Sequence, residues 1–439
     1  MNQPLLGLEQ ANREKYGPRS VCKSWSERIP SLEQYYDNTD LELSYDIYSG
    51  SKTCDKGNLR PLNLDSAIKF LKNSTNSGLP YYTDKGKVKE RVRQRFDYLL
   101  GRKDPCILFT RTQEGNKTRN VWGYPIADTL EEMRYYRPYL AHQSKLPWRS
   151  SLIGPDEVSK RITSMIIDAI ERNFVIISGD ISAFDASVTT SLIDAAFFHI
   201  KKSCQFEYRA GLDRICERFK SIELLTPDGV VSGLHGVPSG STFTNEVDSI
   251  VQYLILKSLG INDENLQIQG DDLVLTCPQE DLSLVKERYS ASHLPLNDEK
   301  SYVARDFCVF LQNLYHIDYI KRGIIGGIYP TYRALGRIMF QERWSDFEDF
   351  DLSGIDYYSI RTISILENCK HHPLFRDLVE FIYKLDKYSL RFSKAAIAKY
   401  DAMLHDSPGV GGFLQHQYGD NVRGINSFET VKILRSLSE

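Results

Sequence analysis

The sequence lacks any uninterrupted apolar run that approaches the length of a membrane span. Its start, MNQPLLGLEQANREKYG, also lacks a positively charged stretch followed by an apolar core. We therefore expect neither secretion nor insertion into a membrane. The eight cysteines are scattered without a Cys-x-x-Cys pair, which favours reduced thiols in an intracellular setting. Cys369, His371 and His372 are followed by no second ligand cluster, so zinc is not expected there.

A large excess of charge of one sign is also missing. The net charge is −3, so the protein is not a polycation that would coat nucleic acid over its whole surface. Locally, residues 85–119 carry eleven Lys and Arg against four acids. The stretch KGKVKERVRQRF within it has two interpretations, the solvated face of a helix or a wall that binds phosphate.

The chain is long enough for several lobes, with 439 residues of which 41% are hydrophobic. No repeat or long linker separates independent domains, so we expect the lobes to fold around each other, with residues 1–60 as an irregular arm draped over them. Helical periodicity is visible over 63–73, 86–100, 126–138, 156–172, 187–204 and 241–259, and strands are predicted at 174–180, 266–269, 272–276 and 307–315. The pattern after about residue 340 is mainly helical. This order predicts an α+β body with a helical C-terminal lobe.

Two acids stand behind a glycine in LQIQGDDLVLT, residues 266–276. The alternating apolar residues on either side predict two short strands, and Gly270 can turn tightly between them. Asp271 and Asp272 then lie at the tip of a hairpin on opposite faces, so one should lead and the other assist in any ligand role. Taken alone, Gly-Asp-Asp is more typical of a solvent-facing turn, because Gly and Asp are ordinary turn residues.

A second acidic site occurs in NFVIISGDISAFDASV, residues 173–188, where an apolar strand ends at Asp180. A buried strand that delivers a carboxylate at its end is a common way to build a metal site on a rigid scaffold. Asp180 is therefore a second candidate ligand. Asp185 follows near the start of a helix, where acids are favoured on structural grounds as well.

A third segment, GLHGVPSGSTFTNEVDSIVQYLI at 233–255, runs from a loop of small residues into an amphipathic helix. Small residues such as Gly240 let the backbone approach a ligand closely. Ser239, Thr244 and Asp248 form a polar series, and the last two share one helical face. A plain capped helix would show the same pattern.

In their order along the chain, these segments resemble motifs A, B and C of viral RNA-dependent RNA polymerases: Asp-x4-Asp at Asp180 and Asp185, Ser-Gly-x3-Thr-x3-Asp from Ser239 to Asp248, and Gly-Asp-Asp at 270–272. The segment GVPSGSTFTNEVDS is most similar to the polymerases of the partitivirus and picobirnavirus branch, whose members copy double-stranded RNA genomes. Further likeness is found in NSGLP at 76–80 (fingertip), RTQEGNKTRNVW at 111–122 (motif F), LPLNDEKS at 294–301 (motif D) and VFLQNLY at 309–315 (motif E).

The resemblance implies a closed right-hand polymerase with an antiparallel palm sheet flanked by helices. It divides the chain into an N-terminal arm and fingers at 1–173, palm with motif A at 174–186, fingers at 187–229, palm with motifs B to E at 230–330, and thumb at 331–439. It also implies an enzyme that replicates and transcribes a viral RNA genome by two-metal nucleotidyl transfer from ribonucleoside triphosphates.

The resemblance gives individual residues expected roles. Asp180, Asp271 and Asp272 are the expected metal ligands, and with Lys300, a proton donor to pyrophosphate, they are the expected catalytic set. The nucleotide contacts implied are Arg111, Lys117, Arg119, Asp185, Ser239, Gly240, Thr244 and Asp248. The metal expected is Mg²⁺, with Mn²⁺ as the alternative, because hard oxygen ligands plus substrate phosphates suffice for it.

The partners implied are an RNA template and the nascent RNA, contacted mostly through the backbone, together with a viral capsid protein. The location implied is the host cytoplasm, within the virion or a replication particle. Two other functions stay open at this point. One is a reverse transcriptase, which would be expected to have a bulky residue against the 2′-hydroxyl in place of the small acid Asp185. The other is a non-catalytic RNA-binding or capsid-associated protein.

Overall fold

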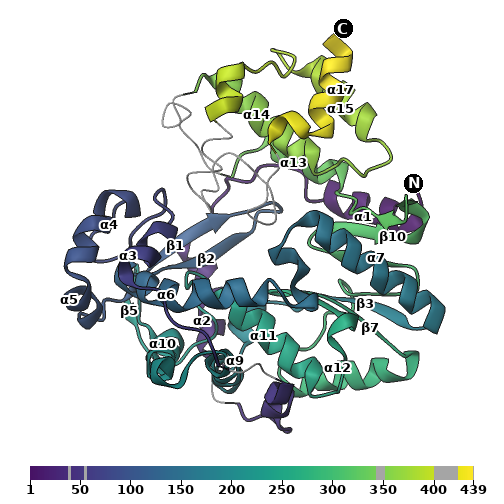
Figure 1. Cartoon of the computed structure of the whole chain (residues 1–439). Helices are drawn as coiled ribbons and strands as arrows, with labels where there is room; N and C mark the ends of the chain where they lie inside the picture. The colour runs from purple at the N-terminus through teal and green to yellow at the C-terminus, as the bar shows by residue number, and fades with distance from the viewer. Residues whose placement is uncertain (38–40, 54–56, 343–351, 400–423, 439) are drawn as a thin grey trace.

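The computed structural model describes residues 1–37, 41–53, 57–342, 352–399 and 424–438. Figure 1 shows one group of elements around β1, β2 and α4 to α6, a second around β3, β7, α7, α11 and α12, and a third, helical group of α13 to α17 beside them. The C-terminal helices are drawn in green and yellow at the top of that view. No helix in the described ranges has the length and apolar character needed to cross a bilayer.

The second group is built on an antiparallel sheet in the order β6-β7-β3-β8. Its strands are β6 (Leu266–Gln269), β7 (Asp272–Cys277), β3 (Val175–Gly179) and β8 (Tyr302–Ala304). β3 pairs with β7 in the register Gly179 opposite Leu273. The predicted strands at 174–180, 266–269 and 272–276 are thus confirmed to within a residue, as is the expected antiparallel palm sheet.

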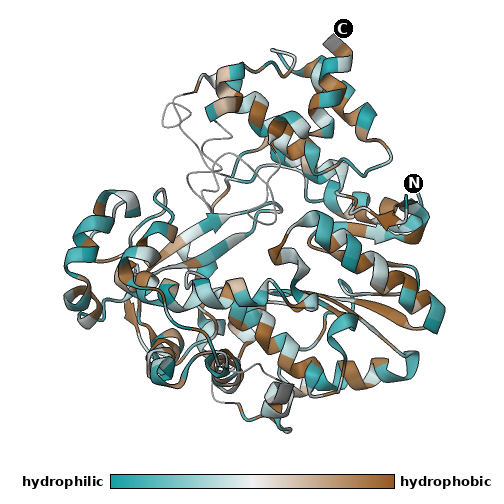
Figure 2. Cartoon of the chain, viewed as in Figure 1, coloured by the Kyte–Doolittle hydropathy of each residue, from teal (hydrophilic) through white to brown (hydrophobic). Residues whose placement is uncertain are grey.

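Helices bury both faces of this sheet. Ile177 and Leu275 pack on the side of α9 (Thr190–Lys202) and α11 (Thr244–Lys257), whereas Ile176 and Val274 pack on the side of α7 (Pro155–Arg172). Successive strand residues point to opposite faces, so a strand covered on both sides must be apolar throughout. Figure 2 shows this as brown colouring along the strands of the sheet. α12 (Leu282–Ala291) packs against α11.

The first group contains a sheet that the sequence did not predict, in the order β2-β1-β4-β5. Its strands are β1 (Cys106–Thr112), β2 (Thr118–Gly123), β4 (Leu224–Thr226) and β5 (Gly229–Val231). The helices of this group are α3 (Leu64–Ala67), α4 (Lys85–Gln94), α5 (Phe96–Gly101), α6 (Ile126–Gln143) and α10 (Arg209–Ser221). On α4, Arg93 pairs with Glu90 and Lys87 with Asp84, as on a solvated helix face.

Two of the predicted elements are wrong in detail. The strand expected at 307–315 is a hairpin of β9 (Phe307–Phe310) and β10 (Asn313–His316). Its turn residues, Leu311 and Gln312, have φ of 52° and 67°, a conformation usually supplied by Gly or Asn. Leu311 is buried in the core, and this burial offsets the cost of its backbone conformation. Because neither turn residue is Gly or Asn, the sequence gives no local sign of the turn. The helix expected at 86–100 is broken between α4 and α5.

The N-terminal residues are more regular than expected. They form α1 (Gln3–Arg13), α2 (Trp25–Asp37) and a 3-10 segment at Ile47–Thr53. Glu9 of α1 accepts hydrogen bonds from the backbone N–H groups of Thr331 (2.7 Å) and Tyr332 (3.1 Å) at the start of α13 (Thr331–Met339). This contact ties the beginning of the chain to the C-terminal helices.

The C-terminal group is helical, as the sequence predicts. α13, α14 (Gly354–Glu367), α15 (Phe375–Leu385) and α17 (Glu429–Ser438) enclose an apolar core of their own. This lobe is therefore stabilised separately from the strand-rich centre.

Candidate active site

The Gly270–Asp271 turn joins β6 to β7 and is held in place by α11. Gln269 pairs with Asp272, so the loop has two residues, and Gly270 has a φ of 64° that suits the first position of a type II′ turn. The Gly270 N–H donates to Ser249 Oγ (2.8 Å), and Gln252 Nε2 donates to the Gly270 carbonyl (2.7 Å). Both partners lie on α11, so the acids stand on a fixed turn, unlike those of a free solvent-facing loop.

Asp180 follows directly after β3, and the register of β3 with β7 places it opposite Asp272. Its backbone is fixed from both sides, because Asp180 N–H donates to Ser301 Oγ (3.1 Å) and Asn297 N–H donates to the Asp180 carbonyl (2.8 Å). Lys300 Nζ lies 4.0 Å from Asp180 Oδ2. The predicted catalytic lysine therefore lies beside a predicted metal ligand.

Asp180, Asp271 and Asp272 influence one another electrostatically. Desolvation, followed by the charges of Asp271 and Asp180, raises the pKa of Asp272 to about 8. Desolvation also raises the pKa of Asp271, while the nearby Arg119 guanidinium opposes that shift. Crowded carboxylates of this kind are stabilised when a cation lies between them.

The same carboxylates do not form a complete metal cage. Among the residues that the structure describes, no three His, Cys, Asp or Glu side chains are grouped closely enough to hold a metal ion by themselves. Mg²⁺ commonly uses one or two carboxylates and takes its remaining ligands from water and substrate phosphates. The hard oxygen donors present fit that coordination, with substrate completing the shell.

Asp185 and Asp248 form a second carboxyl pair, in which Asp185 is half-buried and Asp248 is buried. Asp185 lies in the short α8 (Phe184–Ser187), and Asp248 on α11 is only 4% exposed. Their side chains share a hydrogen bond, and Asp248 Oδ1 has no partner among the described residues. Desolvation, then the Asp271 charge, raises the pKa of Asp185 to about 6. Burial and the charge of Asp185 also raise the pKa of Asp248.

The loop before α11 approaches β2 closely. A Cβ built on Gly240 would lie 1.6 Å from the Trp122 carbonyl oxygen, so no side chain fits there. Ser239 Oγ accepts from Trp122 N–H (3.4 Å) and donates to the Asn120 carbonyl (3.5 Å). Thr244 Oγ1 donates to the Pro238 carbonyl (2.7 Å), so in this structure Thr244 holds the loop itself.

The predicted phosphate contacts lie on the β1–β2 hairpin. Arg119 lies near the acids, since its charge opposes the rise in the pKa of both Asp185 and Asp271. Lys117 is exposed beside the turn. Arg111 makes an ion pair with Glu342, with Nε 2.7 Å from Oε1. Sequence reasoning missed Glu342, because no local pattern connects two residues so far apart in the chain.

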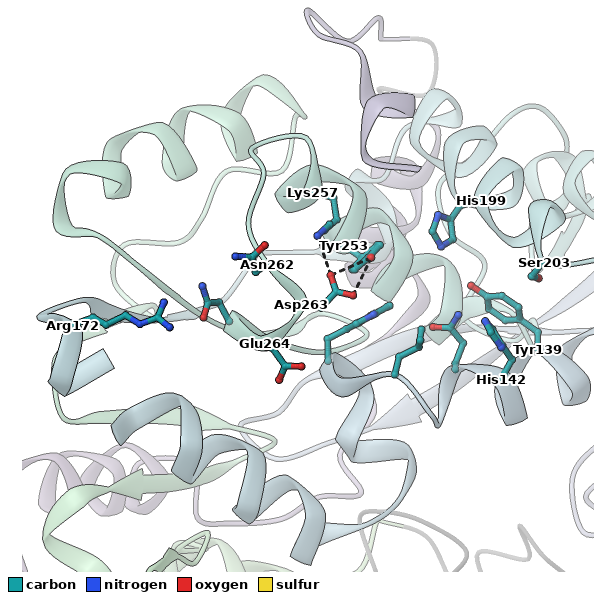
Figure 3. A pocket seen from close by; sticks show the side chains of 14 residues that line it. Tyr139, His142, Arg172, His199, Ser203, Tyr253, Lys257, Asn262, Asp263 and Glu264 are labelled. Atoms are coloured by element: carbon teal, nitrogen blue, oxygen red, sulfur yellow. Dashed lines mark hydrogen bonds and ion pairs between the residues drawn. The ribbon is translucent and has the colours of Figure 1, made fainter. Parts of the chain in front are cut away.

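A separate cavity lies away from these residues. Its volume is about 590 Å³. Figure 3 shows Tyr139, His142 and Tyr253 among its lining side chains. Lys257 at its edge is paired with Asp263 (3.0 Å). As far as the structure describes the chain, the lining includes none of the site residues predicted from the sequence.

An antiparallel sheet that carries carboxylates at the ends of adjacent strands, faced by a basic hairpin, defines the palm of a nucleic-acid polymerase. A family profile described as viral RNA-dependent RNA polymerase matches residues 50–316, and the chain belongs to that family. It is an RNA-directed RNA polymerase, an enzyme that binds RNA and nucleotides and uses divalent metal ions as its family does. This result decides against a reverse transcriptase and against a non-catalytic protein.

Individual relatives agree with the family. The potential RNA-dependent RNA polymerase of a human picobirnavirus is 29% identical over 456 residues, covering 96% of this chain and 81% of the relative. The RNA-directed RNA polymerase of Cryptosporidium parvum virus 1 is 25% identical over 283 residues, covering 57% and 53% of the two chains.

Solved structures confirm the right-hand fold. The crystal structure of the RNA-dependent RNA polymerase of a human picobirnavirus matches with a TM-score of 0.83 and 26% identity, over 99% of this chain and 88% of the other. An insertion loop deletion mutant of that polymerase gives a TM-score of 0.80 and 27% identity, over 99% and 87%.

Proposed function

We propose that Asp180, Asp271 and Asp272 are the metal ligands of this polymerase, with Mg²⁺ as the ion and Mn²⁺ as its alternative. The observation that carries this proposal is the fixed position of Asp180 opposite the Asp271–Asp272 turn on paired strands. Two divalent ions roughly 4 Å apart would neutralise the attacking and leaving oxygens of nucleotidyl transfer. Asp271 and Asp180 are the principal ligands in this proposal, and Asp272 assists.

The β1–β2 hairpin supplies the triphosphate contacts in this account. Arg119 is the best placed of the three basic residues, because its guanidinium already acts on Asp185 and Asp271. Lys117 adds a point charge at the hairpin turn. Arg111 must exchange its carboxylate partner Glu342 for a phosphate, to which an arginine forms paired hydrogen bonds.

Lys300 is proposed to donate a proton to the departing pyrophosphate. Its ammonium lies beside Asp180, at 4.0 Å, and about half of the side chain is exposed, so a leaving group at the metal site is within reach. Proton donation of this kind requires an acid within hydrogen-bond distance of the leaving oxygen.

Asp185, Ser239 and Asp248 are proposed to select ribose. A 2′-hydroxyl both donates and accepts a hydrogen bond, so it can donate to a carboxylate oxygen of the pair, such as the unpartnered Asp248 Oδ1, and accept from a hydroxyl such as that of Ser239. Deoxyribose would leave these buried groups unpaired. Such a site discriminates strongly against the analogue that lacks the hydroxyl. Gly240 and Thr244 support this pocket by shaping its loop.

The biological setting is proposed from the picobirnavirus likeness. The enzyme replicates and transcribes the genome of a double-stranded RNA virus in the host cytoplasm, within a virion or replication particle, with a capsid protein as partner. The division into fingers, palm and thumb at residues 174, 187, 230 and 331 is likewise proposed.

Incorporation of labelled ribonucleotide on a single-stranded RNA with Mg²⁺ tests the proposed chemistry. We expect a product complementary to the template. Absence of product with every divalent ion tried, from protein that is folded and RNA-bound, would contradict the metal assignment.

A further inference from the structure

Helix α2 of the N-terminal arm lies against two parts of the proposed nucleotide site. It packs against both α8, which carries Asp185, and β2, which carries Arg119. No polymerase motif of the sequence includes α2. Its contacts therefore raise the question of what this helix contributes to the site.

The first attachment runs through the backbone of Tyr35. The Gly236 N–H donates to the Tyr35 carbonyl (2.7 Å), and the next N–H, of Val237, donates to the Asp185 carbonyl (2.7 Å). A Cβ on Gly236 would lie 2.5 Å from the Asp185 oxygen, so these segments are in close contact. The position of Asp185 is thus linked to α2 through two consecutive backbone hydrogen bonds.

The second attachment runs through Asn120, the neighbour of Arg119 on β2. Asn120 Nδ2 donates to the Arg28 carbonyl (3.2 Å) and to Ser31 Oγ (3.0 Å), both on α2. The Asn120 carbonyl accepts from Ser239 Oγ (3.5 Å). α2 therefore connects the strand of the phosphate contacts to the loop of the sugar contacts.

The Tyr35 side chain lies close to the loop of the sugar contacts, because it packs against Trp122, whose N–H donates to Ser239 Oγ (3.4 Å). Its ring packs against Trp122, with centroids 5.8 Å apart. Burial, followed by the charges of Asp185 and Asp248, raises the pKa of its hydroxyl, and Arg119 opposes this shift. The ring contact with Trp122 and these charge effects on the hydroxyl agree in placing the Tyr35 side chain near the carboxyl pair.

Tyr36, the next residue, provides a natural comparison. Its ring lies against the same Trp122 (6.3 Å) and against His235 (5.8 Å). Burial and then Cys106 raise the pKa of its hydroxyl, with no contribution from Asp185 or Asp248. The two tyrosines share a helix and an aromatic neighbour, but the charges of Asp185 and Asp248 contribute to the pKa shift of Tyr35 alone.

We propose that Tyr35 is a specificity-determining residue, whose hydroxyl completes the sugar pocket of Asp185 and Asp248 from the N-terminal arm. The inference rests on the proposed sugar role of that pair. A phenol hydroxyl donates and accepts, so it can take part in the hydrogen bonds made around a ribose hydroxyl. The arm thereby becomes part of the active site as well as a brace for the fold.

The test compares Tyr35→Phe with Tyr36→Phe, each of which removes one hydroxyl and keeps the ring. The ratio of kcat/KM for GTP to that for dGTP is measured on one template. We expect Tyr35→Phe to lower this ratio about 2- to 10-fold, the usual effect of losing one hydrogen bond, mainly through slower use of GTP. Tyr36→Phe should keep the wild-type ratio. A wild-type ratio in Tyr35→Phe, or an equal fall in both variants, overturns the proposal.

Asp185→Ala in the same assay separates this proposal from the one on which it rests. A lowered ratio in Asp185→Ala with a wild-type ratio in Tyr35→Phe supports the sugar role of Asp185 and Asp248 and contradicts only the role proposed for Tyr35. An unchanged ratio in Asp185→Ala removes the sugar role of the pair itself. Thermal unfolding of all the variants checks that each is folded before its ratio is interpreted.

Discussion

Arg111 and Glu342 form a two-point ion pair, with Arg111 Nε 2.7 Å from Glu342 Oε1 and Nη2 3.4 Å from Oε2. Arg111 belongs to the β1–β2 hairpin, and Glu342 follows α13 near the start of the helical C-terminal group. Glu342 Oε2 also lies 3.6 Å from Arg19 Nη2. The Glu342 carboxylate thus binds the guanidinium that we propose as a contact for the nucleotide phosphate. Carboxylate and phosphate therefore compete for Arg111.

Glu342→Gln should therefore strengthen nucleotide binding. The neutral amide holds Arg111 more weakly, and an exposed ion pair is worth about 0.2 to 1 kcal/mol, so KM for the nucleotide should fall about 1.5- to 5-fold. Steady-state kinetics with one template measure this change. Glu90→Gln, which breaks the Arg93–Glu90 pair on α4, is the matched control and should leave KM unchanged. A higher KM in Glu342→Gln would mean that the pair assists binding.

Arg119→Ala should weaken nucleotide use. The loss of a charge-assisted contact costs roughly 1.5 to 3 kcal/mol, which lowers kcat/KM by on the order of 10- to 150-fold. Arg119→Lys should recover part of this loss by restoring the charge without the paired geometry. If the nucleotide KM and the turnover of Arg119→Ala match the wild type, Arg119 has no place in the site.

Asp185→Ala should lower the preference for ribonucleotides over deoxyribonucleotides. An unsatisfied buried partner costs about 1 to 3 kcal/mol, or on the order of 5- to 150-fold in the ratio of GTP to dGTP use. Asp248→Asn should have a milder effect, because the amide still forms hydrogen bonds. Matched kcat/KM values for GTP and dGTP decide the point, and an unchanged ratio in Asp185→Ala would exclude it as the sugar-sensing residue.

The contribution of Glu132 to the free energy of unfolding should depend on pH. Its buried carboxylate accepts hydrogen bonds from Ser241 Oγ (2.9 Å) and Thr242 N–H (2.8 Å), and desolvation raises its pKa from 4.5 to about 7. Between these values the folded state binds more protons than the unfolded state, so the contribution of Glu132 to the free energy of unfolding falls as pH rises from about 4.5 to about 7. Glu132→Gln should make the pH dependence less steep in this window, as measured by denaturant unfolding at several pH values. Identical slopes in the two proteins would contradict the assignment.

The parts of the site that local patterns encode were predictable. Alternating apolar residues around Gly270 predict both strands of the hairpin, because strand period and turn chemistry are local properties. The β1–β2 strands were not predicted as strands, since mixed basic and polar residues mask their periodicity. The turn at Leu311 lacks a turn residue altogether.

Contacts between residues far apart in the chain could not be predicted from the sequence. Glu342 contacts Arg111 across 231 positions, and the Tyr35 carbonyl meets Gly236 only after the arm has folded back. The raised pKa values of Asp185 and Asp248 likewise depend on burial by elements from several parts of the chain. Tertiary packing alone determines such relationships.

Nucleotide incorporation by Asp180→Ala and Asp271→Ala tests most directly whether these carboxylates hold the catalytic metal ions. Asp168→Ala, which removes a surface partner of Arg172 on α7, serves as the control and should stay active. Each active-site variant should lose nearly all synthesis with Mg²⁺ and keep the wild-type unfolding temperature, because a ligand is lost and no core packing changes. More than about a tenth of wild-type synthesis in either variant, with normal unfolding, would contradict the metal assignment.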